Sequence, residues 1–311
     1  MKVLVGATFV VAGLFPPASK SSNAESTSLQ WVPIAGGCFM QGSAAYHPEE
    51  RPVAQQCVSG FEMLATEVTN AQFARFVGET GYLTDAERGW RGQEGAERAT
   101  PGSAVFVQPD KVDRSTLNWW RFTPGASWRK PLGADGPDWQ ADAPVVHVTY
   151  NDAQAFATWL DARLPTETEW VFAARGSQPH TDQLAANTWQ GLFPIVDSAH
   201  DGFAGIAPVG SYVANAQNLH DMLGNVWELT STPYSPDHYP STVAIAGERG
   251  FDPAQPREEV VVIKGGSFLC ARAFCYRYRP AARQAQDRQL STSHIGFRLV
   301  RDIQQTHRRG D

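Results

Sequence analysis

Residues 265–279 read GGSFLCARAFCYRYR and place two cysteines, Cys270 and Cys275, five positions apart. On a flat strand this odd spacing points the two sulfurs to opposite faces, and on a helix residues five apart are not neighbours. If the two thiols act together, the backbone between them must turn or bulge. The flanking Arg272, Arg277 and Arg279 favour the thiolate form because they are positively charged. This stretch suits sulfur chemistry, and a structural disulfide is the alternative interpretation.

The first residues of the chain have the pattern of an export signal. Lys2 precedes an uncharged stretch, residues 3–15, which two prolines then interrupt. The sequence Ser22-Asn23-Ala24 matches a small-x-small cleavage site. The uncharged stretch is too short to span a bilayer, which needs about 20 residues. We predict a signal peptide at residues 1–24 and a soluble, periplasmic or secreted protein without a membrane span; the alternative is a buried N-terminal strand.

The overall composition is that of a globular protein. With 311 residues the chain has room for one large domain or two of ordinary size. Hydrophobic residues make up 42% and charged residues 19%, which is enough apolar material to bury a substantial core. The net charge of −6 gives no general reason to bind nucleic acid or an anionic membrane.

Four cysteines in an exported protein predict two disulfide bonds, for which three connectivities exist. Cys38 and Cys57 lie in two short strand-like stretches. A bond between them would join neighbouring strands and contribute about 3 kcal/mol to stability. We interpret this pair as structural, which leaves Cys270 and Cys275 as partners for each other or for a metal ion.

Three segments carry the capping-box pattern of a helix start. Thr69 and Gln72 begin the first predicted helix, and Gly81 ends it. The same pattern occurs at residues 151–154 and at residues 166–169, and Gly176 is expected to end the last helix.

The predicted strands are short and the loops between elements are long. We expect strands at residues 145–149, 260–263 and 296–300, whereas residues 84–142 and 232–258 are rich in Gly, Pro and aromatic residues and read as loops. One irregular α+β domain over residues 28–303, with a C-terminal tail at 304–311, fits this pattern better than two domains.

Further motifs occur in a fixed order along nearly the whole mature chain: VPIAGG (32–37), EVTN (67–70), GYLT (81–84), WW (119–120), SWR (127–129), PVVHV (144–148), RLPTE (163–167), GNVWE (224–228) and GFR (296–298). Together with the cysteine run they resemble the formylglycine-generating enzymes, also called sulfatase-modifying factors. The resemblance implies the C-type-lectin-like fold of that family, which is poor in regular secondary structure. It also implies oxidation of the cysteine in a sulfatase Cys-x-Pro-x-Arg motif to formylglycine.

The resemblance identifies Cys270 and Cys275 as the catalytic thiols, with Ser267 beside them. Two soft thiolates suit copper(I), which accepts a low coordination number. In the family mechanism the substrate cysteine adds a third sulfur, the copper–thiolate complex activates O2, and the resulting thioaldehyde hydrolyses. Structural zinc is a poor competitor because it normally takes four ligands. A disulfide without reactivity is the alternative that the spacing alone would favour.

Family members also bind structural calcium through loop oxygens. The positions that match one calcium site are Asn187, Thr188, Asp201 and Phe203, and those that match a second site are Asp221, Gly224, Val226 and Glu228. Carboxylate, amide and main-chain oxygens are the hard ligands that calcium takes. Both stretches could equally form ordinary turns.

Several tryptophans are candidates for the wall of a peptide-binding groove, namely Trp119, Trp120, Trp128 and Trp227. Packing in the core is the alternative role for each of them.

Other candidate residues are basic. Arg277, Arg279 and Arg283 could bind carbonyl or acidic groups of a substrate, or pair with internal carboxylates. We expect His147 to be a core histidine, and His294 stands where the family usually has asparagine.

The leading hypothesis is a copper-dependent oxidase that acts on exported sulfatases, with the substrate in an unfolded or extended form. One alternative is an exported oxidase of the same fold that acts on a small molecule or siderophore, as in the branch that matures pyoverdine. A non-catalytic, lectin-like accessory module is another.

Overall fold

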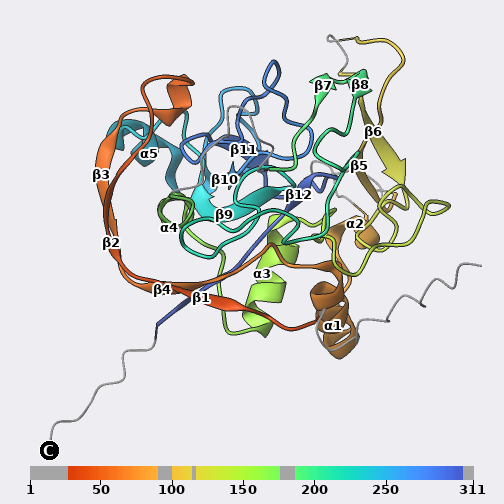
Figure 1. Cartoon of the computed structure of the whole chain (residues 1–311), viewed down its shortest axis with the longest axis horizontal. Helices are drawn as coiled ribbons and strands as arrows, with labels where there is room; N and C mark the ends of the chain where they lie inside the picture. The colour runs from red at the N-terminus through yellow and green to blue at the C-terminus, as the bar shows by residue number, and fades with distance from the viewer. Residues whose placement is uncertain (1–26, 90–99, 114–116, 176–185, 304–311) are drawn as a thin grey trace, which may run out of the picture.

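The computed structural model describes residues 27–89, 100–113, 117–175 and 186–303. They form one irregular α+β domain in which short strands and helices are joined by long loops (Figure 1). The predicted signal peptide (1–24), the tail (304–311) and Gly176 lie outside the described residues. Within the described ranges, no helix combines the length and apolarity needed to cross a membrane.

The helix starts follow local hydrogen-bonding patterns. Helix α1 (Asn70–Thr80) begins at the predicted capping box of Thr69 and Gln72, and Gly81 ends it in the left-handed conformation. Helix α4 (Glu167–Ala173) begins at the predicted box of Thr166 and Glu169. Both predictions are confirmed.

Helix α3 (Tyr150–Trp159) starts earlier than the sequence pattern predicted. Its cap is Thr149, whose hydroxyl accepts the N–H of Asp152 while the Asp152 carboxylate accepts the N–H of Thr149. Two further helices, α2 (Asp85–Arg88) and α5 (Pro240–Ala246), lie in regions that were predicted to be loops. Short 3-10 turns occupy η1 (Pro48–Glu50) and η2 (Gly247–Arg249).

The largest sheet has four strands in the order β11 (Gln284–Asp287), β10 (Val260–Lys264), β9 (Trp227–Pro233) and β12 (Ile295–Gly296). The predicted strand at 260–263 is confirmed as β10, and all its residues are buried. It pairs antiparallel with β9 and β11, whereas β12 pairs parallel with β9 and places Ile295 beside Trp227. This pairing brings residues 295–296 against the segment that carries Trp227.

A second sheet joins the two ends of the described chain. Its strands are β1 (Trp31–Ile34), β4 (Phe61–Leu64) and β13 (Val300–Asp302), all antiparallel, with β4 in the middle. The strand predicted at 296–300 is therefore divided, because Gly296 belongs to β12 and Val300 to β13. The prediction of a strand at 145–149 is wrong: His147 adopts a left-handed φ of 60°, which breaks the extended conformation.

Three hairpins complete the fold: β2 (Gly37–Gln41) with β3 (Ala54–Val58), β5 (Gly102–Phe106) with β6 (Trp120–Pro124), and β7 (Gly191–Leu192) with β8 (Val196–Asp197). Cys38 and Cys57 lie opposite each other in the first hairpin and form a disulfide bond. The other two hairpins lie near each other on the upper right of Figure 1.

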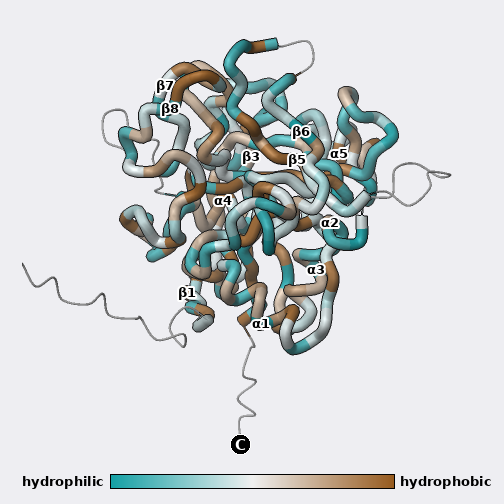
Figure 2. Tube along the Cα trace, turned by 90° about the vertical axis from the view of Figure 1, so that its right-hand side faces the viewer, coloured by the Kyte–Doolittle hydropathy of each residue, from teal (hydrophilic) through white to brown (hydrophobic). Residues whose placement is uncertain are grey.

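The main core lies between α1, α3 and the four-stranded sheet. Phe73 and Phe156 stack with their ring centroids 5.6 Å apart, and Phe297 packs edge-on against Phe156. Apolar residues also reach the surface at the β7–β8 hairpin, as the brown tube in Figure 2 shows, where Leu192 is 67% exposed. The core thus packs α1 and α3 against the four-stranded sheet.

Candidate functional site

The loop that carries the cysteine pair begins with a glycine turn at the end of β10. Gly265 and Gly266 have φ values of 93° and 76°, a region that favours glycine. A Cβ atom on Gly266 would lie 2.9 Å from the backbone nitrogen of Tyr278. Any side chain at this position would therefore push the two ends of the cysteine loop apart.

The backbone between Cys270 and Cys275 reverses direction, as their spacing requires. The N–H groups of Phe274 and Tyr276 both donate to the carbonyl oxygen of Ala271. Cys275 and Tyr276 adopt left-handed φ values of 73° and 44°. The two sulfurs meet and are joined as a disulfide in this structure.

The cysteine pair lies on the wall of a cavity of about 460 Å³. Four other predicted site residues line the same cavity, namely Ser267, Trp227, Trp119 and Trp120, and Arg277 reaches it as well. Ser267 is fully buried, and its hydroxyl accepts the N–H of Leu269. The structure thus brings together residues from β6, β9 and the cysteine loop.

Aromatic residues that the sequence did not single out form much of the remaining wall. Phe193 and Phe274 stack with their ring centroids 4.1 Å apart, and Trp119 packs edge-on against both rings. Phe274 lies between the two cysteines in the sequence, which is a signal that could have identified it. Phe193 comes from the β7–β8 hairpin, and no sequence pattern marks it.

His294 is also part of this cavity wall. Its Nδ1 lies 2.7 Å from the hydroxyl of Thr292, and its ring packs against Trp120. Burial, together with the nearby His147, lowers the pKa of His294 to about 3. The imidazole is therefore neutral at pH 7.

His147 is a fully buried core histidine, as the sequence predicted. Its Nδ1 is 2.8 Å from the hydroxyl of Ser103, and burial lowers the pKa of His147 to about 4.

The structure corrects the substrate-binding prediction for Trp128. This residue is fully buried in the main core, where it packs edge-on against Phe73 and beside Trp139. It does not line the cavity, so the alternative role in the core applies.

Two of the three candidate arginines are also internal. Arg279 pairs with Glu50, and Arg283 pairs with Glu167 at 2.9 Å, with all four side chains buried. Neither guanidinium is available to a substrate, and the carboxylate of Glu50 offsets the charge of Arg279. Arg277 lines the cavity but pairs with Glu49 at 2.6 Å.

Glu167 is the centre of a buried charge cluster behind the cysteine loop. Besides Arg283 it accepts hydrogen bonds from Lys264 at 3.2 Å and lies 3.3 Å from His238. Burial raises the pKa of Glu167, but attraction to Arg283 and Lys264 outweighs burial and holds it well below its ordinary value. Burial lowers the pKa of Lys264 to about 8. This cluster ties the end of β10 to the start of α4.

The first predicted calcium set comes together in one loop. The carboxylate of Asp201 accepts the N–H groups of Thr188 and Phe203. The Oδ1 atom of Asn187 is buried and has no hydrogen-bond partner, which is costly without a cation or water beside it. Burial also raises the pKa of Asp201. These residues fit a calcium ion.

The second predicted calcium set is arranged differently. Glu228 is buried and binds the guanidinium of Arg298 through both carboxylate oxygens, at 2.7 and 2.8 Å, so its charge is already neutralised. Asp221 accepts the N–H of Gly210, while Gly224 and Val226 lie in the tight turn before β9. The unpartnered oxygen in this region belongs instead to Glu67, whose pKa is raised well above its ordinary value by burial and by Asp221.

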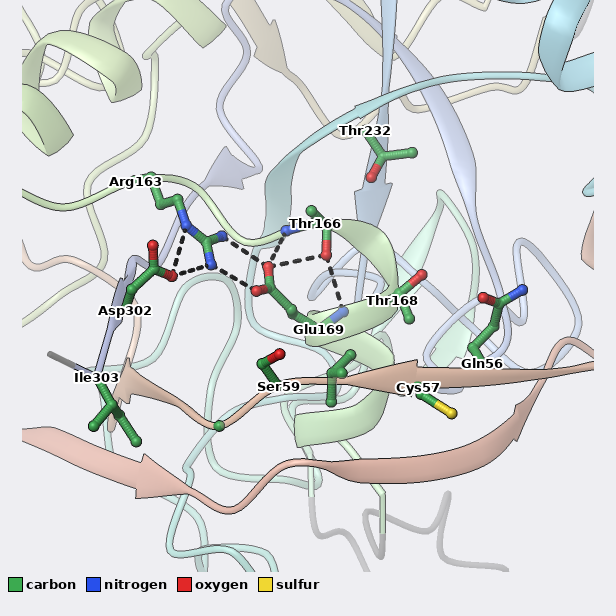
Figure 3. Close-up of a pocket in the computed structure, with 12 residues that line it drawn as sticks. Gln56, Cys57, Ser59, Arg163, Thr166, Thr168, Glu169, Thr232, Asp302 and Ile303 are labelled. Carbon is green, nitrogen blue, oxygen red and sulfur yellow. Dashed lines mark hydrogen bonds and ion pairs between the residues drawn. The ribbon is translucent and has the colours of Figure 1, made fainter. Parts of the chain in front are cut away.

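A second hollow, of about 910 Å³, lies between β3 and the start of α4 (Figure 3). Its charged residues are satisfied by one another, because Arg163 pairs with Glu169 at 2.6 Å and with Asp302 at 2.7 Å. None of the candidate catalytic residues lines it.

Comparison with known proteins agrees with this arrangement. The model of the sulfatase-modifying factor enzyme 1-like domain matches residues 17–303. The formylglycine-generating enzyme of Mycobacterium tuberculosis is 44% identical over 87% of this chain and 97% of its own length, and that of Thermomonospora curvata is 40% identical over 87% and 93%. The solved structure of PvdO from Pseudomonas aeruginosa shares the fold, with a TM-score of 0.61 and 19% identity over 89% of this chain and 98% of its own. The chain therefore belongs to the formylglycine-generating enzyme, or sulfatase-modifying factor, family.

Proposed function

We propose that this protein oxidises the cysteine of a sulfatase Cys-x-Pro-x-Arg motif to formylglycine. The observation that carries the proposal is the placement of Cys270 and Cys275 on the wall of an open aromatic cavity, beside Ser267 and Trp227, in a chain of this family. A purely structural disulfide has no need of a cavity. Here the sulfurs border a space in which a peptide side chain can lie.

The donor set suits copper(I) bound by Cys270 and Cys275 after reduction of their disulfide. Thiolates are the ligands that copper(I) prefers, and among the described residues no group of three or more His, Cys, Asp or Glu side chains could hold a metal such as zinc. Copper, when bound there, would supply the activation of O2.

The protein's own residues would bind and orient the substrate. The stacked rings of Phe193 and Phe274 and the edge of Trp119 offer an apolar surface to an extended peptide beside the sulfurs. Because the cavity admits a chain segment and not a folded domain, the sulfatase would be recognised in an unfolded or extended form. We further propose structural calcium at Asn187, Thr188, Asp201 and Phe203, on the strength of the unpartnered Asn187 oxygen.

The test is oxidation of a Cys-x-Pro-x-Arg peptide by reduced, copper-loaded protein in air, followed by mass spectrometry. The expected product has the mass loss that accompanies conversion of the CH2SH group to an aldehyde. Cys270→Ser and Cys275→Ser should each abolish conversion and weaken copper binding, whereas the double variant Cys38→Ser/Cys57→Ser should retain both below its unfolding temperature. Absence of conversion by the wild-type protein would refute the proposal.

A further inference from the structure

The imidazole of His294 has one nitrogen engaged and the other available. Nδ1 lies 2.7 Å from the hydroxyl of Thr292. Nε2 makes no hydrogen bond to any described residue. It is also not one of the fully buried polar atoms that lack a partner. The ring lines the cavity, so we infer that Nε2 is the nitrogen open to it.

The contact with Thr292 also favours one tautomer of the His294 ring. Among the described residues Nδ1 is the only acceptor within hydrogen-bond distance of the Thr292 hydroxyl, so we assign the hydroxyl as the donor and Nδ1 as the acceptor. A neutral imidazole whose Nδ1 accepts carries its hydrogen on Nε2. With a pKa of about 3, the ring is too weak a base to take the proton of a thiol, whose pKa is about 8.5. His294 therefore offers the cavity a fixed, neutral N–H donor.

Two other polar side chains on the wall, Gln286 and Arg277, are already engaged, whereas the amide of Gln284 makes no hydrogen bond to a described residue. The amide of Gln286 donates to the carbonyl oxygens of Asp287 and Leu290, and Arg277 donates to Glu49 and to the carbonyl oxygen of Arg283. Much of the remaining wall is aromatic or aliphatic. A peptide that enters such a cavity loses water from its carbonyl groups, each of which then needs a donor.

We propose that His294 determines peptide binding in this cavity by donating its Nε2–H to a backbone carbonyl oxygen of the peptide held at Cys270 and Cys275. This inference rests on the proposed function, because its ligand is the peptide substrate of that function. His294 keeps its proton throughout, so its contribution is to affinity and placement.

Three variants separate the hydrogen bond from the shape of the ring. His294→Phe keeps a ring against Trp120 but removes the donor, whereas His294→Gln keeps an N–H donor near the position of Nε2. Thr292→Val preserves the volume of Thr292 but removes the hydroxyl that fixes the tautomer. Thermal unfolding of each variant reports whether the fold is retained.

The measurements are KM and kcat for the Cys-x-Pro-x-Arg peptide, and the Kd of the same peptide with serine in place of cysteine. The Kd is measured on reduced, copper-free protein by tryptophan fluorescence, so it does not depend on turnover. For His294→Phe we expect KM and Kd to rise about five- to tenfold, the loss of one neutral hydrogen bond, with kcat little changed. His294→Gln should stay within about threefold of wild type, and Thr292→Val should fall between the two.

Unchanged KM and Kd in a folded His294→Phe variant would overturn the inference, as would weakened copper binding with unchanged peptide affinity. If wild-type protein binds the serine peptide but never oxidises the cysteine peptide, the proposed function fails. The ratio of the Kd values of His294→Phe and wild type then still decides the role of His294. If wild-type protein binds neither peptide, both proposals fail.

Discussion

At the scale of single residues, the most consequential side chain outside the cavity is Glu167. Its carboxylate is shared by Arg283, Lys264 and His238 in the interior. Removing one partner of a buried ion pair leaves the others charged and without compensation, which costs more than the pair itself contributes.

We expect Glu167→Gln to destabilise the protein by about 3–5 kcal/mol at pH 7, because Arg283 and Lys264 lose their counter-charge. The folded-state pKa of Glu167 lies below its ordinary value, so its stabilising effect is present above about pH 4.3 and is lost as the pH falls further. The difference between variant and wild type should therefore shrink in acid. Urea unfolding at several pH values measures it.

The matched control for this prediction is Glu259→Gln. Glu259 pairs with Arg249 at 3.2 Å and with Arg288 at 3.6 Å, but its own side chain is 41% exposed. Its loss should change stability by less than about 0.5 kcal/mol. Equal effects of the two substitutions would contradict the role given to the buried cluster.

At the scale of elements, the glycine turn after β10 sets the position of the cysteine loop. Gly266→Ala would introduce both a left-handed alanine and a clash with the backbone of Tyr278. We expect it to destabilise the protein by more than about 2 kcal/mol and to reduce peptide oxidation at least tenfold.

Gly81→Ala is the control for this turn, because Gly81 has a similar φ of 68° at the end of α1 but open space around its Cβ position. It should cost about 1–2 kcal/mol and leave oxidation unchanged. A stable, fully active Gly266→Ala variant, judged by thermal unfolding and peptide turnover, would show that the turn does not position the cysteines.

Elements whose signals are local could be predicted from the sequence. The capping boxes of α1 and α4 lie within four residues, so their hydrogen bonds can be read directly. Residues 296–300 were harder, because only pairing with distant strands divides them between β12 and β13. The same distinction holds for the site residues. Cys270 and Cys275 lie in one short stretch of sequence and could be identified, whereas Phe193 reaches the cavity through a separate hairpin.

Burial likewise cannot be read from residue type. Trp128 and Trp227 look equivalent in the sequence, yet Trp128 packs beside α1 and Trp227 lies at the cavity because β9 pairs with β12. Arg279 and Arg283 were candidates for substrate binding only because Glu50 and Glu167 are distant along the chain.

At the scale of the whole molecule, calcium should raise the free energy of unfolding. An ion that binds the folded chain at the Asn187–Asp201 loop stabilises it by about 2.7 kcal/mol at a free concentration of 100 Kd. We expect a chelator to lower Tm, and the calcium-dependent rise in Tm to disappear in Asp201→Asn.

The neighbouring substitution Asp197→Asn is the control, since Asp197 accepts N–H groups of its own turn and is not a proposed ligand. It should leave the calcium response intact. A response that is the same in wild type and Asp201→Asn, measured by calorimetry, would place the ion elsewhere or exclude it.

The three-stranded sheet has a consequence for how the protein is made. Strand β13 pairs with β4, so that Val300 lies beside Met63, and β1 occupies the other side of β4. A growing polypeptide cannot close this sheet until residues 300–302 have been made. Until then this edge of β4 has no partner strand, and unpaired strand edges are prone to aggregation. The three-stranded sheet is therefore complete only in a chain that includes residues 300–302.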